Sequence, residues 1–135
     1  MYRTQVVFGE IRASAKRKAA IVQVRLRVSK SSIFNINSRP VLNYFRDETH
    51  RAIALDVFKL IKCFRFNVKA TARGGGASSQ AHALKLALLK CMLYLGNEIK
   101  EIYKNSNTFT TDARRVERKK YGLAKARRSY QFSKR

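Results

Sequence analysis

Residues 20–28 read Ala-Ile-Val-Gln-Val-Arg-Leu-Arg-Val, and this stretch carries the clearest structural signal in the chain. Apolar side chains alternate with Gln23, Arg25 and Arg27. Because successive side chains of a strand point to opposite faces of a sheet, the alternation predicts a half-buried strand. One face of the predicted sheet is therefore apolar and the other is basic.

Residues 64–72 repeat this design, with apolar side chains on one face and Arg65, Asn67 and Lys69 on the other. The two long strands would present their basic residues to the same surface. Shorter strands are predicted by the same alternation, around Gln5–Ile11 and Ile33–Ile36.

Helices are predicted between and after these strands. Residues 79–95 place Ala and Leu at three- and four-residue steps and are apolar on most sides, which indicates a central buried helix. Ser78 or Ser79 would cap it. Three shorter helices are expected: one from Pro40 through Phe45 after a turn at residues 37–40, one over Glu48–Phe58 with Asp47 as its cap, and one over residues 97–104.

The fold class that follows is α+β, with a single mixed β-sheet and helices packed on one side. Residues 1–107 are predicted to form a globular RNA-binding domain. Residues 108–135 are predicted to form a basic tail, because their scattered apolar residues could not cover a core. At most, the tail would be helical near Val116–Tyr121.

The charge balance limits the choice of partner. The chain has 30 Lys and Arg residues against 8 acidic ones, a formal net charge of +22. Such an excess disfavours the compact state unless a polyanion neutralises it, so nucleic acid is the leading partner. An acidic membrane is the second choice, but neither a basic amphipathic helix nor a lipid anchor is clear. No membrane-length apolar run and no signal peptide is visible.

The tail is the most basic segment. Residues 112–135 contain ten Lys or Arg residues and two acidic residues, which leaves +8. Cations release counterions on binding phosphates, and the interleaved Tyr121, Tyr130 and Phe132 could stack on bases. The alternative is a solvated tail or a localisation signal. The candidate RNA-binding residues of the tail are Arg114, Arg115, Arg118, Lys119, Lys120, Lys125, Arg127 and Arg128.

Two smaller features are candidate phosphate sites. Gly74-Gly75-Gly76 joins a strand to a helix, so its amides could hold a phosphate at the helix N-terminus, although a tight packing turn explains it equally well. Lys16, Arg17 and Lys18 are expected in a loop before the strand at 20–28. With Arg25 and Arg27 they would extend the basic surface, unless they are simply solvated.

Catalytic and metal sites are not indicated. Cys63 and Cys91 lie far apart and are read as buried apolar residues, and His50 and His82 stand alone. No nucleophile–base pattern or metal-ligand spacing is present, so no cofactor, no small-molecule substrate and no enzymatic activity is expected. The remaining alternatives are a basic architectural protein for DNA and a phosphate-handling enzyme that uses the glycine turn.

Several blocks together resemble a known family. Residues 112–123 read DARRVERKKYGL, followed by KARR at 125–128 and QFSKR at 131–135. Three further blocks appear in the same order: KRKAA at 16–20, INSRP at 36–40 with Tyr44-Phe45, and GGGASSQA at 74–81. With these, the chain resembles the universal small-subunit ribosomal protein nine family of the bacterial and organellar type.

The resemblance implies a fold like the second domain of ribosomal protein five, and a place in the head of the small subunit. The implied partners are small-subunit ribosomal RNA, neighbouring head proteins and the peptidyl-site tRNA. Besides the basic residues already named and the three glycines, it implies Gln80 as an RNA-binding residue. The positions that match the family's tRNA-contacting end are Ser133, Lys134 and Arg135.

Two departures from the family pattern stand out: Ser79 replaces a usual glycine, and Tyr130 replaces a common proline. The many Lys, Asn, Phe and Ile residues indicate an AT-rich genome. The expected location is therefore an organellar ribosome, with the mitochondrion favoured over the plastid and the bacterial cytoplasm kept as the alternative.

Overall fold

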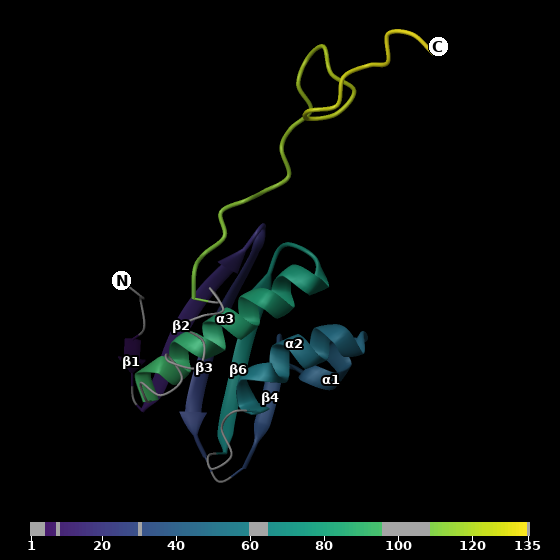
Figure 1. The fold of residues 1–135 in the computed structure, drawn as a ribbon. Coiled ribbons are helices and arrows are strands. Elements are labelled where there is room, and N and C mark those ends of the chain that lie inside the picture. The colour runs from purple at the N-terminus through teal and green to yellow at the C-terminus, as the bar shows by residue number, and fades with distance from the viewer. Residues whose placement is uncertain (1–4, 8, 30, 60–64, 96–108, 135) are drawn as a thin grey trace.

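The computed structural model describes residues 5–7, 9–29, 31–59, 65–95 and 109–134. They form a mixed sheet of six strands in the order β1-β2-β3-β6-β4-β5, with helices on one face (Figure 1). The strands are β1 (Gln5–Val7), β2 (Glu10–Arg17), β3 (Ala20–Val28), β4 (Ile33–Ile36), β5 (Arg39–Pro40) and β6 (Phe66–Arg73). The helices are α1 (Val41–Tyr44), α2 (Glu48–Lys59) and α3 (Ala77–Leu95).

The strand pairing makes the sheet mixed. β3 pairs antiparallel with both β2 and β6, whereas β4 runs parallel to β6. Parallel neighbours need a crossover connection, and here the chain between β4 and β6 passes through α1 and α2 on the helical face. The predicted fold class, a single mixed sheet with helices on one side, is confirmed.

The core lies between the helical face of the sheet and α3. Val22, Val24 and Leu26 of β3 are at most 1% exposed, and Leu84 and Leu88 of α3 are equally covered. Each such side chain contributes about 1.5–3 kcal/mol when it leaves water. The long apolar run at 79–95 is therefore the central buried helix that its spacing predicted.

The first part of the sheet differs from the prediction. Instead of one strand over residues 5–11, there are two, and β2 continues to Arg17. Lys16 and Arg17 are therefore strand residues and were wrongly expected in a loop, while Lys18 lies in the turn with a φ of +52°. β2 was hard to recognise because its inward residues include Ala13 and Ala15, which have weak strand preference.

Two element ends also differ. Val28 was expected on the apolar face, but it is 53% exposed because it lies at the end of β3, beyond the cover of the helices. Helix α3 begins at Ala77, so neither Ser78 nor Ser79 is its cap; both lie in the first turn. The Gly76 carbonyl accepts the amide hydrogen of Gln80 at 3.0 Å.

Helix α2 begins as predicted. Asp47 Oδ1 accepts the Thr49 amide hydrogen at 3.1 Å, and the Asp47 carbonyl accepts that of Arg51 at 3.2 Å, which is the geometry of a capping residue. His50 does not stand alone, because its Nδ1 lies 3.3 Å from Asp47 Oδ2. The predicted turn is centred on Asn37 and Ser38, which both have positive φ, and Arg39–Pro40 form the short strand β5 before α1.

The tail runs away from the domain (Figure 1). The tail was expected to be helical at most near Val116–Tyr121; those residues are not helical, and the chain turns back further on, through a bridge between Leu123 and Ser129. The helix predicted over residues 97–104, together with Cys63 and Phe64, lies outside the described residues. Within the described ranges, no helix combines the length and hydropathy that a membrane span requires.

Candidate nucleic-acid interface

The face of the sheet opposite the helices carries a row of polar side chains, which we call the open face. In register across four strands, Arg12 of β2 is opposite Arg25 of β3, Arg25 is opposite Lys69 of β6, and Lys69 is opposite Asn35 of β4. Like charges directly opposite one another repel. Such a row is stabilised when an anion lies across it, so this surface suits a phosphate backbone.

The open face is also hollowed. A depression of about 610 Å³ is lined by Arg25, Lys69 and the turn after β4 at Asn37 and Ser38. In the described part of the chain, the buried side-chain polar atoms without a hydrogen-bond partner are Arg12 Nε and Asn67 Oδ1. Both residues alternate onto this face, but the two atoms themselves are covered by neighbouring atoms.

The open face is bordered by an acidic residue at one edge. Glu10 at the start of β2 lies 3.4 Å from Arg12 Nη2 and 3.9 Å from Arg27 Nη2. These are partly exposed pairs and contribute little to stability. Glu10 thus orients two guanidinium groups without neutralising the centre of the row.

The glycine turn contacts the turn between β2 and β3. Gly74 and Gly75 have φ of +69° and +65°. A Cβ on Gly74 would lie 2.6 Å from the Ala19 carbonyl oxygen, and one on Gly75 would lie 2.9 Å from Ala20. Close packing therefore explains these two glycines, and it brings the basic cluster at residues 16–18 beside the start of α3.

Gln80 connects the glycine turn to Tyr44 of α1, whose hydroxyl lies 3.5 Å from Asn37 Nδ2 in the turn after β4. Its Nε2 donates to the Gly74 carbonyl at 3.0 Å, and its Oε1 accepts from the Tyr44 hydroxyl at 2.8 Å. Asn37 in turn exchanges two hydrogen bonds with the Ala72 backbone, at 2.9 and 3.0 Å. The predicted RNA-binding residue Gln80 is therefore held by the protein itself, in a network that fixes both turns.

The tail leaves the domain beside the same cluster. Arg17 Nη1 donates to Asp112 Oδ2 at 2.7 Å, and Asp112 Oδ1 accepts from the backbone and Nε of Arg114. The hydrogen bonds from Arg114, helped by the charge of Arg17, lower the pKa of Asp112 to about 2. A small basic hollow at this root is completed by His82, whose pKa is lowered by burial and by nearby cations, and by Lys85.

The rest of the tail exposes its cations and aromatic rings. Tyr121 is 97% exposed, and Phe132 is fully exposed. Glu117 forms an ion pair with Arg127, and this pair closes a loop in the tail. Of the three predicted tRNA-contacting residues, Ser133 and Lys134 are exposed, and Arg135 lies outside the described residues.

The structure groups the predicted RNA-binding residues into three regions. Arg25 and Arg27 are exposed on the open face; Lys16, Arg17, Lys18, the glycines and Gln80 gather around the two turns; and Arg114, Arg115, Arg118, Lys119, Lys120, Lys125, Arg127 and Arg128 follow in the tail. Arg12 and Asn35 were missed as candidates. Continuing the alternation of β2 back to Glu10 would have identified Arg12.

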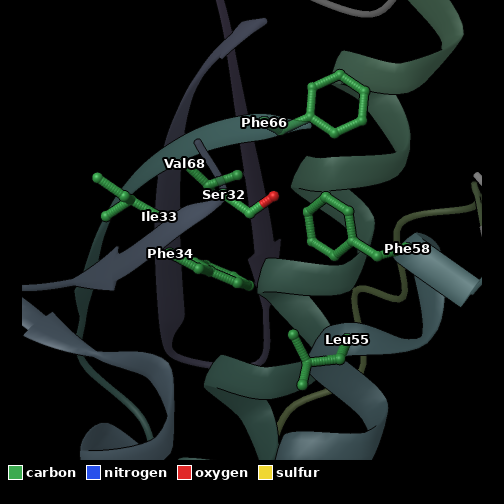
Figure 2. Close-up of a pocket in the computed structure, with 7 residues that line it drawn as sticks. All are labelled: Ser32, Ile33, Phe34, Leu55, Phe58, Phe66 and Val68. Carbon is green, nitrogen blue, oxygen red and sulfur yellow. The ribbon is translucent and has the colours of Figure 1, made fainter. Parts of the chain in front are cut away.

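An apolar hollow of about 230 Å³ lies elsewhere, where α2 faces the ends of β4 and β6. Figure 2 shows Phe58 and Leu55 from α2 facing Phe34 and Phe66 across it. Phe34 and Phe58 pack edge to face, with centroids 5.8 Å apart. The hollow offers no cation to a phosphate, so it lies outside the candidate interface.

In the described ranges, no three His, Cys, Asp or Glu side chains lie close enough together to hold a metal ion. Cys91 is fully buried in α3, as predicted, and burial raises its thiol pKa to about 12. A thiol protonated at neutral pH is a poor ligand and nucleophile.

Comparisons with known proteins identify the family and several relatives of this chain. A family model described as ribosomal protein S9/S16 matches residues 15–135. Small ribosomal subunit protein uS9 of Rhodococcus opacus (strain B4) is 38% identical over 131 residues, which cover 96% of this chain and 76% of that protein. The protein of the same name from Mycolicibacterium smegmatis is also 38% identical over 131 residues, or 96% of this chain and 87% of the relative. That from Saccharopolyspora erythraea is 36% identical over 126 residues, or 93% and 82%.

Proposed function

The chain belongs to the ribosomal protein S9/S16 family, and from this we propose that it binds small-subunit ribosomal RNA in the subunit head and extends its tail to the peptidyl-site tRNA. It is a ribosomal protein of the small subunit and not an enzyme. The RNA-binding residues are those of the open face, the two turns and the tail. Neighbouring head proteins are the further partners.

The observation that carries the RNA proposal is the row of Arg12, Arg25 and Lys69 across the open face. Three cations in adjacent strands, at a spacing set by the sheet, present an extended positive surface to a phosphate backbone.

The tail proposal rests on its form and its charge. We propose that residues 1–107 form a globular unit and residues 108–135 an arm. In the described part of the arm, Asp112 anchors the chain, which then projects from the domain. Its exposed Lys134 can neutralise a phosphate of the tRNA, with Ser133 as a hydrogen-bonding neighbour. Arg135 is included because it directly follows Lys134 and carries the same positive charge.

The proposed cellular compartment is inferred from amino-acid composition alone. The abundance of Lys, Asn, Phe and Ile supports an organellar ribosome, and we place the chain in a mitochondrion ahead of a plastid. The three relatives are bacterial and give this assignment no support over a bacterial cytoplasm.

The RNA proposal is tested by neutralising the row one charge at a time. Arg25→Gln and Lys69→Gln should each weaken binding to transcribed small-subunit ribosomal RNA and reduce the slope of log affinity against log salt by about 0.7–0.9. Lys59→Gln, at the end of α2 on the helical face, is the matched control and should leave the slope unchanged. Equal slopes for all three variants would contradict binding through the open face. Duplex DNA as competitor separates RNA preference from general polyanion binding.

A further inference from the structure

The two carboxylates of the tail are both engaged with arginines. Asp112 joins the root to Arg17, and Glu117 lies within the basic run. Glu117 Oε2 accepts from Arg127 Nε at 3.1 Å, and Oε1 accepts from Arg127 Nη2, so the pair is bidentate. Lys120 Nζ lies 3.5 Å from the same carboxylate. A fork-to-fork pair fixes direction as well as distance.

This pair closes a loop that the backbone also closes. Leu123 and Ser129 form an antiparallel bridge, and the Ala124 amide donates to the Arg128 carbonyl at 2.7 Å. The turn into the bridge uses Gly122, at a φ of +72°. Leu123, Ala124 and Ala126 are only partly exposed, in a tail that otherwise exposes nearly every side chain. Residues 117–129 therefore have a defined shape, which we call the tail loop.

The side chains that remain on the outside of the tail loop are those suited to RNA. Arg118, Lys119 and Arg128 are exposed, and Tyr121 is 97% exposed. Arg127 differs because two of its nitrogens are bonded to Glu117. We propose that Glu117 is a positioning residue, which uses Arg127 to hold the tail loop so that its other cations and Tyr121 face RNA in a fixed arrangement.

Simple electrostatics predicts the opposite effect of Glu117. A carboxylate beside a polyanion is repelled, so its removal from an unstructured tail should strengthen RNA binding. An exposed ion pair adds little to the stability of the free protein. Its benefit comes on binding, because side chains and backbone ordered beforehand lose less freedom when the complex forms. The sign of the effect therefore distinguishes a positioning role from simple repulsion.

The test uses the full chain and transcribed small-subunit ribosomal RNA, and it rests on the proposed RNA-binding function. Glu117→Gln and Arg127→Gln should each weaken binding about threefold to tenfold, and the double variant should be no weaker than the Arg127→Gln variant. Arg118→Gln should instead act independently of Glu117→Gln and reduce the salt slope by about 0.7–0.9. Glu48→Gln on α2 is the control for removal of a carboxylate and should not weaken binding.

A second experiment rebuilds the ion pair with the two charges swapped. A double variant that carries both Glu117→Arg and Arg127→Glu keeps the net charge. It should recover at least half of the binding free energy that is lost in the single variants. Tighter binding by Glu117→Gln, or additive effects of the two single variants, would overturn the inference while leaving RNA binding intact. Failure of the unaltered chain to bind this RNA would overturn the proposed function itself, and the inference with it.

Discussion

Arg17 Nη1 lies 2.7 Å from Asp112 Oδ2, so an ion pair joins the end of β2 to the start of the tail, 95 residues further along the chain. Ile11, Ala13 and Ala15 are buried on the helical face of β2. Arg17 is the next residue on that face and is only partly buried, at the end of the strand. The root of the tail is consequently fixed beside the turn between β2 and β3, which the glycine turn also contacts. RNA bound at the turns would continue directly onto the tail.

The protonation of Asp112 should report on its contacts at the root of the tail. Its folded-state pKa is lowered to about 2, so the charged contact contributes fully above the unfolded pKa near 3.8 and disappears as the pH falls toward 2. Carbon-detected NMR should find the midpoint near 2. Arg114→Ala should raise the pKa more than Arg17→Ala, because Arg114 makes the largest contribution. A midpoint that stays near 3.8 in the unaltered protein would contradict the contact.

Alanine substitutions at the three glycines of the turn should differ in their cost in unfolding free energy. Gly74→Ala and Gly75→Ala place a Cβ at positive φ against the Ala19 and Ala20 backbone, so each should cost about 2 kcal/mol or more in urea unfolding. Gly76→Ala meets nothing within 4 Å and should cost less than about 1 kcal/mol. Equal destabilisation at the three positions would show that packing against the turn is not what requires glycine.

The hydrogen bond between Tyr44 and Gln80 should make the effects of substituting the two residues on unfolding free energy non-additive. Tyr44→Phe and Gln80→Ala each remove one side of the 2.8 Å hydrogen bond and should each cost about 1 kcal/mol in chemical denaturation. The double variant should be destabilised by less than the sum, because the second change removes a bond already broken. Strict additivity would argue against a shared network. Asn37→Ala should cost more, since it leaves two Ala72 backbone groups without their partner.

The end of the tail should affect tRNA without affecting the domain. Deleting residues 133–135 should leave the urea midpoint unchanged, because Ser133 and Lys134 are exposed. In reconstituted small subunits the same deletion should weaken retention of peptidyl-site tRNA and lower its salt slope by about 0.7–0.9 for each phosphate that the tail no longer neutralises. Unchanged tRNA affinity and slope in the truncated subunit would contradict the proposed contact.

The long strands and the buried helix were predictable because their side chains follow one period over many residues. The alternation at 20–28 and the Leu spacing at 79–95 each specify a face that must be buried. β2 was underestimated because Ala13 and Ala15 give a faint apolar signal, and a cluster of cations at its end resembles a loop. Arg12, the first member of the open-face row, was missed for the same reason.

The site was predictable by residue type and less so by role. Charge and aromatic content correctly marked the tail as exposed, but they could not show that Glu117 and Arg127 bond to each other across ten residues. Gln80 entered through a resemblance, and one of its two protein hydrogen bonds comes from a tyrosine 36 residues away. Long-range pairings of this kind arise from the fold, so no local pattern contains them.

The most direct measurement is sedimentation of the full chain with ribosomal particles from cells that make it. We expect the protein to migrate with the small subunit in a low-salt gradient and to stay with it when the subunits are separated. A protein that remains at the top of the gradient while the ribosomes are intact would contradict the central claim that this chain is an RNA-bound component of the small subunit.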